Sequence, residues 1–308
     1  MLVASSLEQI HTPTAIALGN FDGIHQGHQL VLQSIINSQK SQRSDIYTSV
    51  LSFTPHPQEF FTGKKRQLLT PTVEKAEILA NLGIEQLILL PFNQQLASLS
   101  AEKFVTKILV QQLNAKEVSV GLDFRFGYQR KGTGLDLKNI AADFDITVHL
   151  NSLHQIRNQD DQNVRVSSTL IRQALADGLP RVAKAMLGRP YSLTGEVVTG
   201  QQLGRTIGFP TANLKLLPEK LLPKFGVYAV DVLLNQTVIK GVMNIGCRPT
   251  VAGESPTIEV HLLNWSGDLY DQTLKVNLID FLRPEQKFPS VEALKQQITK
   301  DCQAVLNN

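Results

Sequence analysis

The first half of the chain alternates between two spacings of apolar residues. Short, apolar runs of strand length occur at residues 14–18, 46–53, 86–90, 117–120 and 146–149. Apolar residues recur every three or four positions, as in helices, at residues 29–36, 72–82, 101–113 and from Asp136 onward. Strands that alternate with helices predict βαβ units, and therefore an α/β domain with a parallel, Rossmann-like sheet.

The pattern changes near residue 180, after two short helices of which the second starts at Pro180. Closely spaced strand patterns then follow at residues 191–198, 227–234, 237–244, 257–263 and 274–282. They predict an antiparallel sandwich or a small antiparallel β-barrel. Ser290 then caps an amphipathic C-terminal helix that reaches residue 306.

Length and composition fit this division. A chain of 308 residues is long enough for about two domains, which we place at residues 1–185 and 186–308. It is 42% hydrophobic and 19% charged, as in globular proteins. The net charge of +3 is too small to argue for nucleic acid by itself, and there is no long basic tract, so we expect no nucleic-acid partner. A mildly basic balance suits anionic small substrates, and solubility explains it equally well.

The cysteines and the hydropathy of the chain indicate in which cellular compartment the protein is expected. Cys247 and Cys302 form neither a metal-binding spacing nor a disulfide framework, which favours two unpaired thiols. Residues 1–10 lack the features of a signal peptide, and no apolar run approaches the roughly 18–20 residues that span a bilayer. We expect a cytoplasmic protein that does not enter a membrane.

The decapeptide at residues 19–28, GNFDGIHQGH, carries the most chemistry. It joins an apolar strand to a helix, a geometry that points backbone N–H groups and the positive helix end at a bound anion. His25 and His28 lie one helical turn apart, and Gly27 between them lets a phosphate approach closely. The segment predicts a site that binds and cleaves a nucleotide polyphosphate. For Asp22, a catalytic role and a turn-forming role remain equal alternatives.

Three later segments are candidates to complete this site. SFTPHP contains Phe53 and His56, which either touch a ligand or belong to a loop shaped by its two prolines. In GLDFRFG, Asp123 is a candidate nucleotide ligand, while the aromatics, Phe124 among them, either pack a flavin or fill the core. RVSST opens a helix, where hydroxyl and N–H groups suit phosphate.

A second constellation lies in the β-rich half. In GRTIGFPTAN, residues 204–213, the glycines allow phosphate to approach the backbone, and Thr211 and Asn213 offer neutral oxygens that suit Mg²⁺ held with ATP phosphates. From spacing alone, an ordinary hairpin with a proline-containing turn is an equal alternative to a phosphate-binding site. Glu259 is a candidate base, although strand alternation also allows an outward, solvated side chain.

The first-half motifs GNFDGIHQGH, SFTPHP, GLDFRFG and RVSSTLIR resemble the HxGH nucleotidylyltransferase superfamily, and more closely the bacterial bifunctional riboflavin kinase/FAD synthetases. The resemblance implies that the first domain transfers AMP from ATP to FMN, releasing pyrophosphate and forming FAD. His25 and His28 would then hold ATP phosphates. The nucleotide-binding positions it implies are Asn20, Asp123, Arg165, Ser168 and Thr169.

The second-half motifs GRTIGFPTAN, FGVY, NIGCRPT, IEVHLL and FLRPEQKF resemble the flavokinase module. This resemblance implies that riboflavin and ATP give FMN and ADP, that Thr211 and Asn213 serve Mg-ATP, and that Glu259 is the base. Gly204 and Arg205 are further candidates for ATP binding. Arg283 either closes the flavin pocket or forms a salt bridge on the surface. The candidate flavin contacts are Phe53, His56, Phe124 and Arg283.

Two departures from the flavokinase pattern are visible. Asn264-Trp265 stands where relatives often have Asp-Phe, and Asp271 stands where a glycine commonly follows Leu-Tyr. Two other functions compete with the bifunctional enzyme. One is a flavin-binding protein with decayed catalytic sites, and the other is a single adenylyltransferase whose β domain only binds.

Overall fold

The structure is a computed structural model that describes residues 1–42, 45–157, 161–200, 202–234, 237–250 and 253–307. The chain divides into two compact units, Met1–Ser168 and Thr169–Asn308. The domain boundary that the sequence predicts, between residues 185 and 186, stays a prediction. Within the described residues, no helix is both long and apolar enough to cross a membrane.

The first unit contains a six-stranded sheet in which every neighbouring pair is parallel. In sheet order its strands are β1 (Leu2–Ala4), β4 (Gln86–Pro91), β3 (Tyr47–Thr54), β2 (Thr14–Leu18), β5 (Ala115–Gly121) and β8 (Thr147–Asn151). Two small antiparallel pairs accompany it, β6 (Arg125–Phe126) with β7 (Gly132–Thr133) and β9 (Gln155–Arg157) with β10 (Asn163–Arg165).

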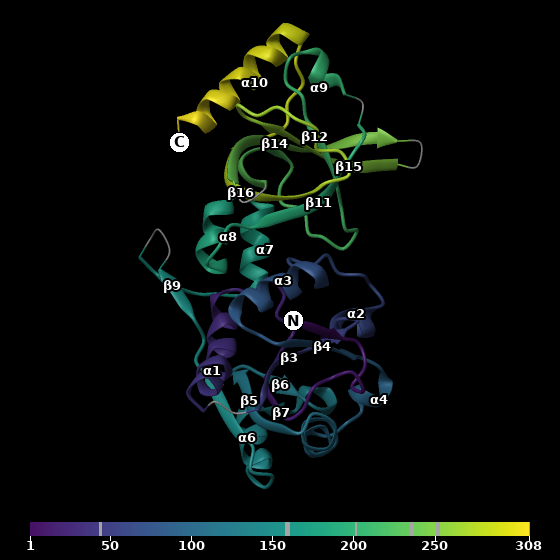
Figure 1. The fold of residues 1–308 in the computed structure, drawn as a ribbon, viewed down its shortest axis with the longest axis vertical. Helices are drawn as coiled ribbons and strands as arrows, with labels where there is room; N and C mark the ends of the chain where they lie inside the picture. Colours follow the sequence, from purple (N-terminus) through teal and green to yellow (C-terminus); the bar gives the residue numbers. More distant parts are fainter. Residues whose placement is uncertain (43–44, 158–160, 201, 235–236, 251–252, 308) are drawn as a thin grey trace. The chain divides into compact units, whose positions relative to one another are not determined.

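Helices cover both faces of this sheet (Figure 1). One face is covered by α1 (Gln26–Gln42) and α3 (Thr72–Leu82). The other face is covered by α5 (Ala101–Phe104), its π-helical continuation Val105–Gln112, and α6 (Gly134–Ala142). Shorter helices are α2 (Pro57–Thr62) and α4 (Gln94–Ala97). Strand alternation explains the two cores: Ala15 and Ala17 pack under α1, whereas Ile16 and Leu18 pack on the opposite face.

The strand order reverses between β2 and β5. From β2 the chain adds β3 and then β4 on one side, and afterwards places β5 on the other side of β2. In open α/β sheets, ligands bind outside the carboxyl ends of the strands at such a switch point. The turns after Leu18 and Gly121, which carry GNFDG and GLDF, therefore lie where the fold places a ligand.

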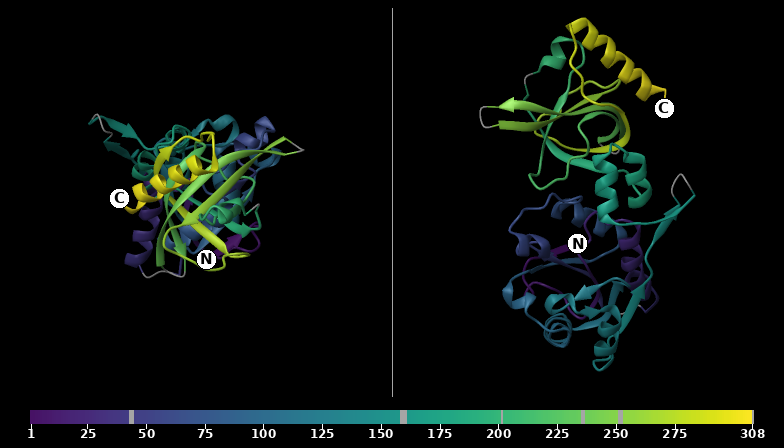
Figure 2. Two further views of the ribbon diagram at one scale, coloured as in Figure 1. Left: turned by 90° about the horizontal axis from the view of Figure 1, so that it is seen from above. Right: turned by 180° about the vertical axis from the view of Figure 1, so that it is seen from behind.

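The second unit is a closed six-stranded antiparallel barrel with helices on its outside (Figure 2). In barrel order its strands are β11 (Ser192–Val198), β12 (Ala212–Leu216), β15 (Gly253–Leu262), β14 (Thr237–Thr250), β13 (Gly226–Leu234) and β16 (Thr273–Arg283). The helices are α7 (Ser168–Ala176), α8 (Pro180–Leu187), α9 (Leu203–Thr206) and α10 (Val291–Leu306).

The C-terminal helix α10 lies along the barrel wall (Figure 1, Figure 2). Cys302 and Val305 of α10 pack against Val227, Ala229 and Val242 of the barrel. The predicted fold class is confirmed: a parallel α/β domain is followed by an antiparallel barrel and a C-terminal helix. Of the two all-β alternatives, the chain forms the barrel.

Candidate active sites

The turn between β2 and α1 is tightly wound. Phe21 and Ile24 have φ of 49° and 41°, and Gly23 has φ of 88°. Positive φ is strained for a β-branched residue, and such strain gathers at functional sites. Both Phe21 and Ile24 are fully buried in the core under α1. Their packing holds the turn in this conformation, which presents His25 and the start of α1.

The two histidines lie face to face. The rings of His25 and His28 stack with centroids 3.6 Å apart. The His28 backbone N–H donates to His25 Nδ1 at 3.2 Å, which leaves the neutral His25 ring with its proton on Nε2. The Nδ1 atom of His28 is buried and has no hydrogen-bond partner among the described residues. Each ring therefore keeps a polar atom for a ligand.

Burial controls the charge of this pair. It lowers the pKa of His25 to about 4, against a smaller opposing effect of Asp22. It also holds the pKa of His28 well below its usual range, and the neighbouring His25 and Lys75 lower it further. Both rings are therefore neutral at pH 7 before a ligand binds, and they act as hydrogen-bond donors rather than as cations.

Asn20 and Asp22 have different surroundings in the same turn. Asn20 Oδ1 is buried without a hydrogen-bond partner among the described residues. One carboxylate oxygen of Asp22 accepts the N–H groups of Leu69 and Thr70, at 2.8 and 3.3 Å. Asp22 therefore joins the turn to the segment before α3, which differs from the local turn-forming role, whereas Asn20 Oδ1 is an unused acceptor among the described residues.

Three predicted nucleotide-binding residues contact this region or one another. Ser168 Oγ donates to the Asp22 carbonyl oxygen at 2.8 Å. Arg165 forms an ion pair with Asp123, and its charge contributes to the lowered pKa of His25. Thr169 follows Ser168 as the second residue of α7.

The predicted flavin contacts of the first unit have structural partners of their own. His56 is the N-cap of α2, because its Nδ1 accepts the Gln58 N–H at 3.0 Å while Glu59 accepts the His56 N–H at 3.0 Å. His56 therefore has a structural role as a helix cap, and its contact with a ligand stays a prediction. Burial, aided by Arg66, lowers the pKa of this ring. Phe124 stacks on the core residue Phe126, with centroids 5.6 Å apart.

Phe53 belongs to an aromatic cluster that the sequence did not reveal. Its ring meets Phe92 edge-on at 5.7 Å, and Phe60 and Phe61 contact the same Phe92 ring at 5.4 and 5.8 Å. Phe61 is 68% exposed, which is unusual for a phenylalanine inside such a cluster. The cluster lies beside the carboxyl ends of β3 and β4, the ligand-binding edge of the sheet.

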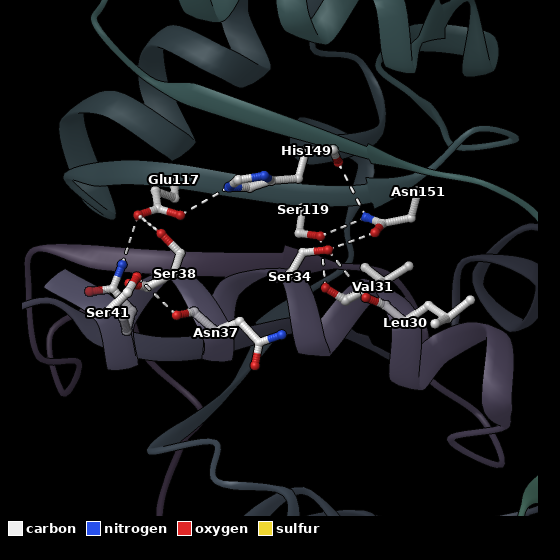
Figure 3. A network of polar contacts seen from close by, with 11 residues as sticks. Leu30, Val31, Ser34, Asn37, Ser38, Ser41, Glu117, Ser119, His149 and Asn151 are labelled. Carbon is white, nitrogen blue, oxygen red and sulfur yellow. Dashed lines mark hydrogen bonds and ion pairs between the residues drawn. The ribbon is translucent and has the colours of Figure 1, made fainter.

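Polar contacts fix helix α1 on the sheet (Figure 3). Glu117 of β5 accepts a hydrogen bond from Ser38 Oγ at 2.7 Å and lies 3.0 Å from His149 Nε2. Nearer the start of α1, Ser34 Oγ donates to Asn151 Oδ1 of β8 at 2.6 Å. Because these partners are directional, they set the position of α1, and with it the position of His28.

In the barrel, Glu259 lies in a row of polar residues across three strands. It is opposite Asn213 of β12 on one side and opposite Asn244 of β14 on the other. Its neighbours Ile258 and Val260 are buried, so Glu259 points to the outside of the barrel. The side chain points outward, as strand alternation allowed, but it lines a cavity beside α10 rather than an open surface.

Two cavities of about 570 Å³ each meet at Thr211. The first is lined by Arg205 and by the loop at residues 265–270. The second lies beside α9 and α10, and Glu259, Asn244 and Arg283 contribute to its wall. Gly204, at the start of this region, admits no side chain, because a Cβ there would overlap the Phe209 carbonyl oxygen. Because Thr211 lines both cavities, a ligand group bound at Thr211 can reach either of them.

Arg283 is fixed by α10. Its Nη2 lies 2.8 Å from Asp301 Oδ2, its Nε also contacts this carboxylate, and its guanidinium lies over the Phe288 ring at 5.7 Å. The Arg283 and Asp301 side chains are 17% and 6% exposed, so the pair is largely buried. Arg283 does form a salt bridge, but inside the unit rather than on the surface, and the same side chain lines the second cavity.

Comparisons with known proteins decide the family. Family models match residues 7–170 as FAD synthetase and residues 187–308 as riboflavin kinase. The bifunctional riboflavin kinase/FMN adenylyltransferase of Escherichia coli K12 is 41% identical over 93% of this chain and 90% of its own length. The chain belongs to the bifunctional riboflavin kinase/FMN adenylyltransferase family. The Pseudomonas fluorescens and Bacillus subtilis relatives of the same name are 39% and 35% identical, each over 97% of this chain and 94% of their own length.

A solved structure supports the fold of the whole chain. A Streptococcus pneumoniae protein described as a macrolide-efflux protein is 32% identical and superposes with a TM-score of 0.87. The match covers 100% of this chain and 99% of that chain. The efflux description differs from the name of the curated relatives and is a statement about the Streptococcus protein.

The two departures from the riboflavin kinase pattern have different surroundings in the barrel unit. Trp265 lines the first cavity. Asp271 has φ of 61°, a conformation that glycine adopts without strain and that aspartate adopts more readily than most residues. The positive φ explains why glycine suits this position, and aspartate adopts the same backbone conformation at a modest cost.

Gly27→Ala is expected to lower adenylyl transfer without weakening the fold. A Cβ at this position would lie 3.2 Å from His25 Cε1 and 3.3 Å from His25 Nδ1, so the ring must shift. Alanine favours a helix over glycine, so α1 itself gains stability. We expect kcat for FAD formation to fall about 10- to 100-fold, with the melting temperature unchanged or raised. Gln33→Ala, at an exposed position of the same helix, is the control and keeps full activity. Full activity of Gly27→Ala would show that the position of the His25 ring is unimportant.

Asp301→Ala is expected to destabilise the barrel unit. It leaves the largely buried Arg283 without its carboxylate, which typically costs about 3–5 kcal/mol. Trp265, the one tryptophan of the chain, reports unfolding of this unit by fluorescence in a denaturant titration. The exposed neighbour Lys300→Ala should change the free energy of unfolding by less than about 0.5 kcal/mol. Equal transitions for the two variants would contradict the importance of the Arg283–Asp301 pair.

Proposed function

We propose that the chain performs two consecutive reactions, one at each constellation. Riboflavin and ATP give FMN and ADP in the barrel, and FMN and a second ATP give FAD and pyrophosphate in the α/β unit. The observation that carries this proposal is that one chain, similar to bifunctional relatives over almost its full length, retains both constellations. A cytoplasmic location, where ATP is available, stays a prediction.

In the adenylylation site, His25 and His28 donate hydrogen bonds to phosphate oxygens of ATP. Their neutral state supports this role, because each ring then offers an N–H group and neither needs to lose a proton. The FMN phosphate attacks the α-phosphorus, and pyrophosphate leaves as negative charge builds on the oxygens that the rings face. Asn20 Oδ1 supplies the unused acceptor of the turn for the nucleotide.

The remaining predicted residues of this site bind the two substrates. Ser168 and Thr169, at the start of α7, bind phosphate, and Asp123 and Arg165 bind the nucleotide. The isoalloxazine ring of FMN packs near Phe53 and Phe124. The exposed aromatic surface that adjoins Phe53 supports this placement. His56 shapes the loop on which this surface depends.

In the kinase site, Glu259 takes the proton of the riboflavin 5′-hydroxyl as that oxygen attacks the γ-phosphorus of ATP. The cavity beside α10 receives riboflavin, because it holds Glu259, Arg283 and the apolar side of α10. The other cavity receives ATP, with Arg205 of its wall near the phosphates. Gly204, the residue before Arg205, lines the riboflavin cavity and is a further candidate for ATP phosphate binding. Thr211 lies in the walls of both cavities, where the transferred phosphoryl group must pass.

Both reactions are proposed to need Mg²⁺, and the oxygens in the barrel fit this ion. Thr211 and Asn213 supply hard, neutral oxygens, and Asn213 is opposite the Glu259 carboxylate. Mg²⁺ typically uses one or two side chains together with substrate phosphates and water. The described residues contain no cluster of three His, Cys, Asp or Glu side chains placed for a metal. When bound, the ion would neutralise developing phosphate charge.

One assay tests both reactions. The protein is incubated with riboflavin, ATP and Mg²⁺, and the flavins are separated by chromatography. The expected products are FMN and then FAD, and an excess of chelator stops both. If no FMN forms, the kinase proposal fails and a flavin-binding or single-activity protein takes its place. FMN without FAD excludes the adenylylation proposal.

A further inference from the structure

Lys75 is a buried cation beside the adenylylation site that sequence reasoning did not single out. It belongs to the first turn of α3 and is only 9% exposed. Its Nζ donates to the Asn20 carbonyl oxygen at 2.7 Å and to Ser52 Oγ at 3.3 Å. Ser52 Oγ in turn donates to the same carbonyl at 3.2 Å. The lysine thus links helix α3 to the ends of two neighbouring strands, β2 and β3.

The segment that leads into α3 contacts the same turn at further points. The backbone N–H groups of Leu69 and Thr70 donate to the Asp22 carboxylate, and Thr70 Oγ1 accepts the Gly23 N–H at 2.9 Å. Those contacts hold the second half of the turn. Lys75 holds the first half, where Asn20 keeps an unused, buried acceptor.

The chemistry of these contacts is unusual for a structural lysine. Both acceptors are neutral oxygens, and a buried ammonium is costly unless its charge serves a partner. Its surroundings include Asp22 of the turn, His28 of α1 and His56 before α2. Burial lowers the pKa of Lys75 to about 8, and Asp22 opposes this effect. The ammonium form therefore predominates at neutral pH and is lost as the pH rises above about 8.

We propose that Lys75 is a positioning residue for adenylyl transfer, because its ammonium fixes the turn that presents Asn20, His25 and His28. A charged donor makes a stronger hydrogen bond to the Asn20 carbonyl than a neutral amine does. Burial lowers the pKa of His28 most, and the Lys75 charge adds a smaller effect in the same direction. This inference rests on the proposed adenylylation function.

The test compares the wild type with Lys75→Met and Lys75→Arg. The quantity measured is kcat/KM for ATP in FMN adenylylation, from neutral pH to about pH 10, because it reports ionisations of the free enzyme. At neutral pH we expect Lys75→Met to lose about 10- to 100-fold. The wild type should decline above about pH 8 toward the level of Lys75→Met. Lys75→Arg should stay above Lys75→Met and decline only at higher pH, since arginine keeps its charge.

Two controls separate this role from a loss of folding. The melting temperature of each variant and its riboflavin kinase activity, which belongs to the other unit, are measured in the same preparations. Wild-type activity of Lys75→Met, or a decline above pH 8 that persists unchanged in Lys75→Met, overturns the proposal. A wild-type profile that stays flat through this range overturns it even if both variants fail to fold. Absence of FAD from the wild type overturns the adenylylation function itself, a result visible before any variant is made.

Discussion

Glu259→Gln is expected to abolish FMN formation while leaving the conversion of supplied FMN to FAD unchanged. Glutamine keeps the size and a hydrogen-bonding oxygen of glutamate but cannot take the proton of the riboflavin 5′-hydroxyl. Loss of a general base typically lowers kcat by about 10²- to 10⁴-fold. Glu259 lies in the barrel wall opposite Asn213, whereas the adenylylation residues lie at the edge of the parallel sheet. The two activities should therefore separate in one variant.

The control for this variant is Glu196→Gln, an exposed glutamate of strand β11 in the same barrel. It changes the net charge of the barrel by the same amount and should keep full kinase activity. The measurement is the initial rate of FMN formation, with FAD formation from supplied FMN determined in parallel. Kinase activity of Glu259→Gln equal to that of Glu196→Gln would show that another group is the base.

His28→Ala is expected to produce the opposite result, in which riboflavin is converted to FMN and FMN accumulates. The substitution removes a ring that stacks on His25 and that offers one buried nitrogen with no hydrogen-bond partner in the described part of the chain. A well-placed donor to a developing phosphate charge is worth about 10²- to 10³-fold in kcat. Because burial keeps His28 neutral, its contribution should not depend on pH near 7.

The control is His11→Ala, an exposed histidine of the same unit that precedes β2 and therefore lies at the amino ends of the strands. The rate of pyrophosphate release with FMN and ATP measures the effect directly. Unchanged pyrophosphate release in His28→Ala would contradict the phosphate-binding role of the histidine pair. A pH-dependent loss near pH 7 in the wild type would contradict the neutral state of the rings.

Local sequence signals predicted the long elements well. Helix α3 has the bounds expected from its periodicity, because Gly83 adopts φ of 95° and ends it. Strand β1 was missed because it has three residues at a sheet edge, with Val3 43% exposed. The helix after Ser100 was predicted as one element, and the structure continues it as a π-helix from Val105. Apolar spacing does not distinguish these hydrogen-bond patterns.

The site was predictable where its residues are close in sequence. The His25–His28 spacing and the strand-to-helix turn follow from local rules. Lys75 gave no signal, because a helical lysine is usually solvated and its acceptor, the Asn20 carbonyl, is 55 residues away in the chain. For Glu259, alternation predicted the outward direction, but only the tertiary fold places a cavity with α10 there. A single sequence does not show which side chains are buried by elements that are distant along the chain.

We propose above that one chain carries two complete and separable active sites. Mixing Glu259→Gln with His28→Ala, in the presence of riboflavin, ATP and Mg²⁺, tests it most directly. We predict that each variant alone makes FAD from riboflavin at no more than about 1% of the wild-type rate, and that the mixture makes it much faster, because FMN released by His28→Ala is adenylylated by Glu259→Gln. FAD formation by either variant alone at a rate near that of the wild type, or a mixture no faster than the single variants, would contradict the assignment of one reaction to each unit.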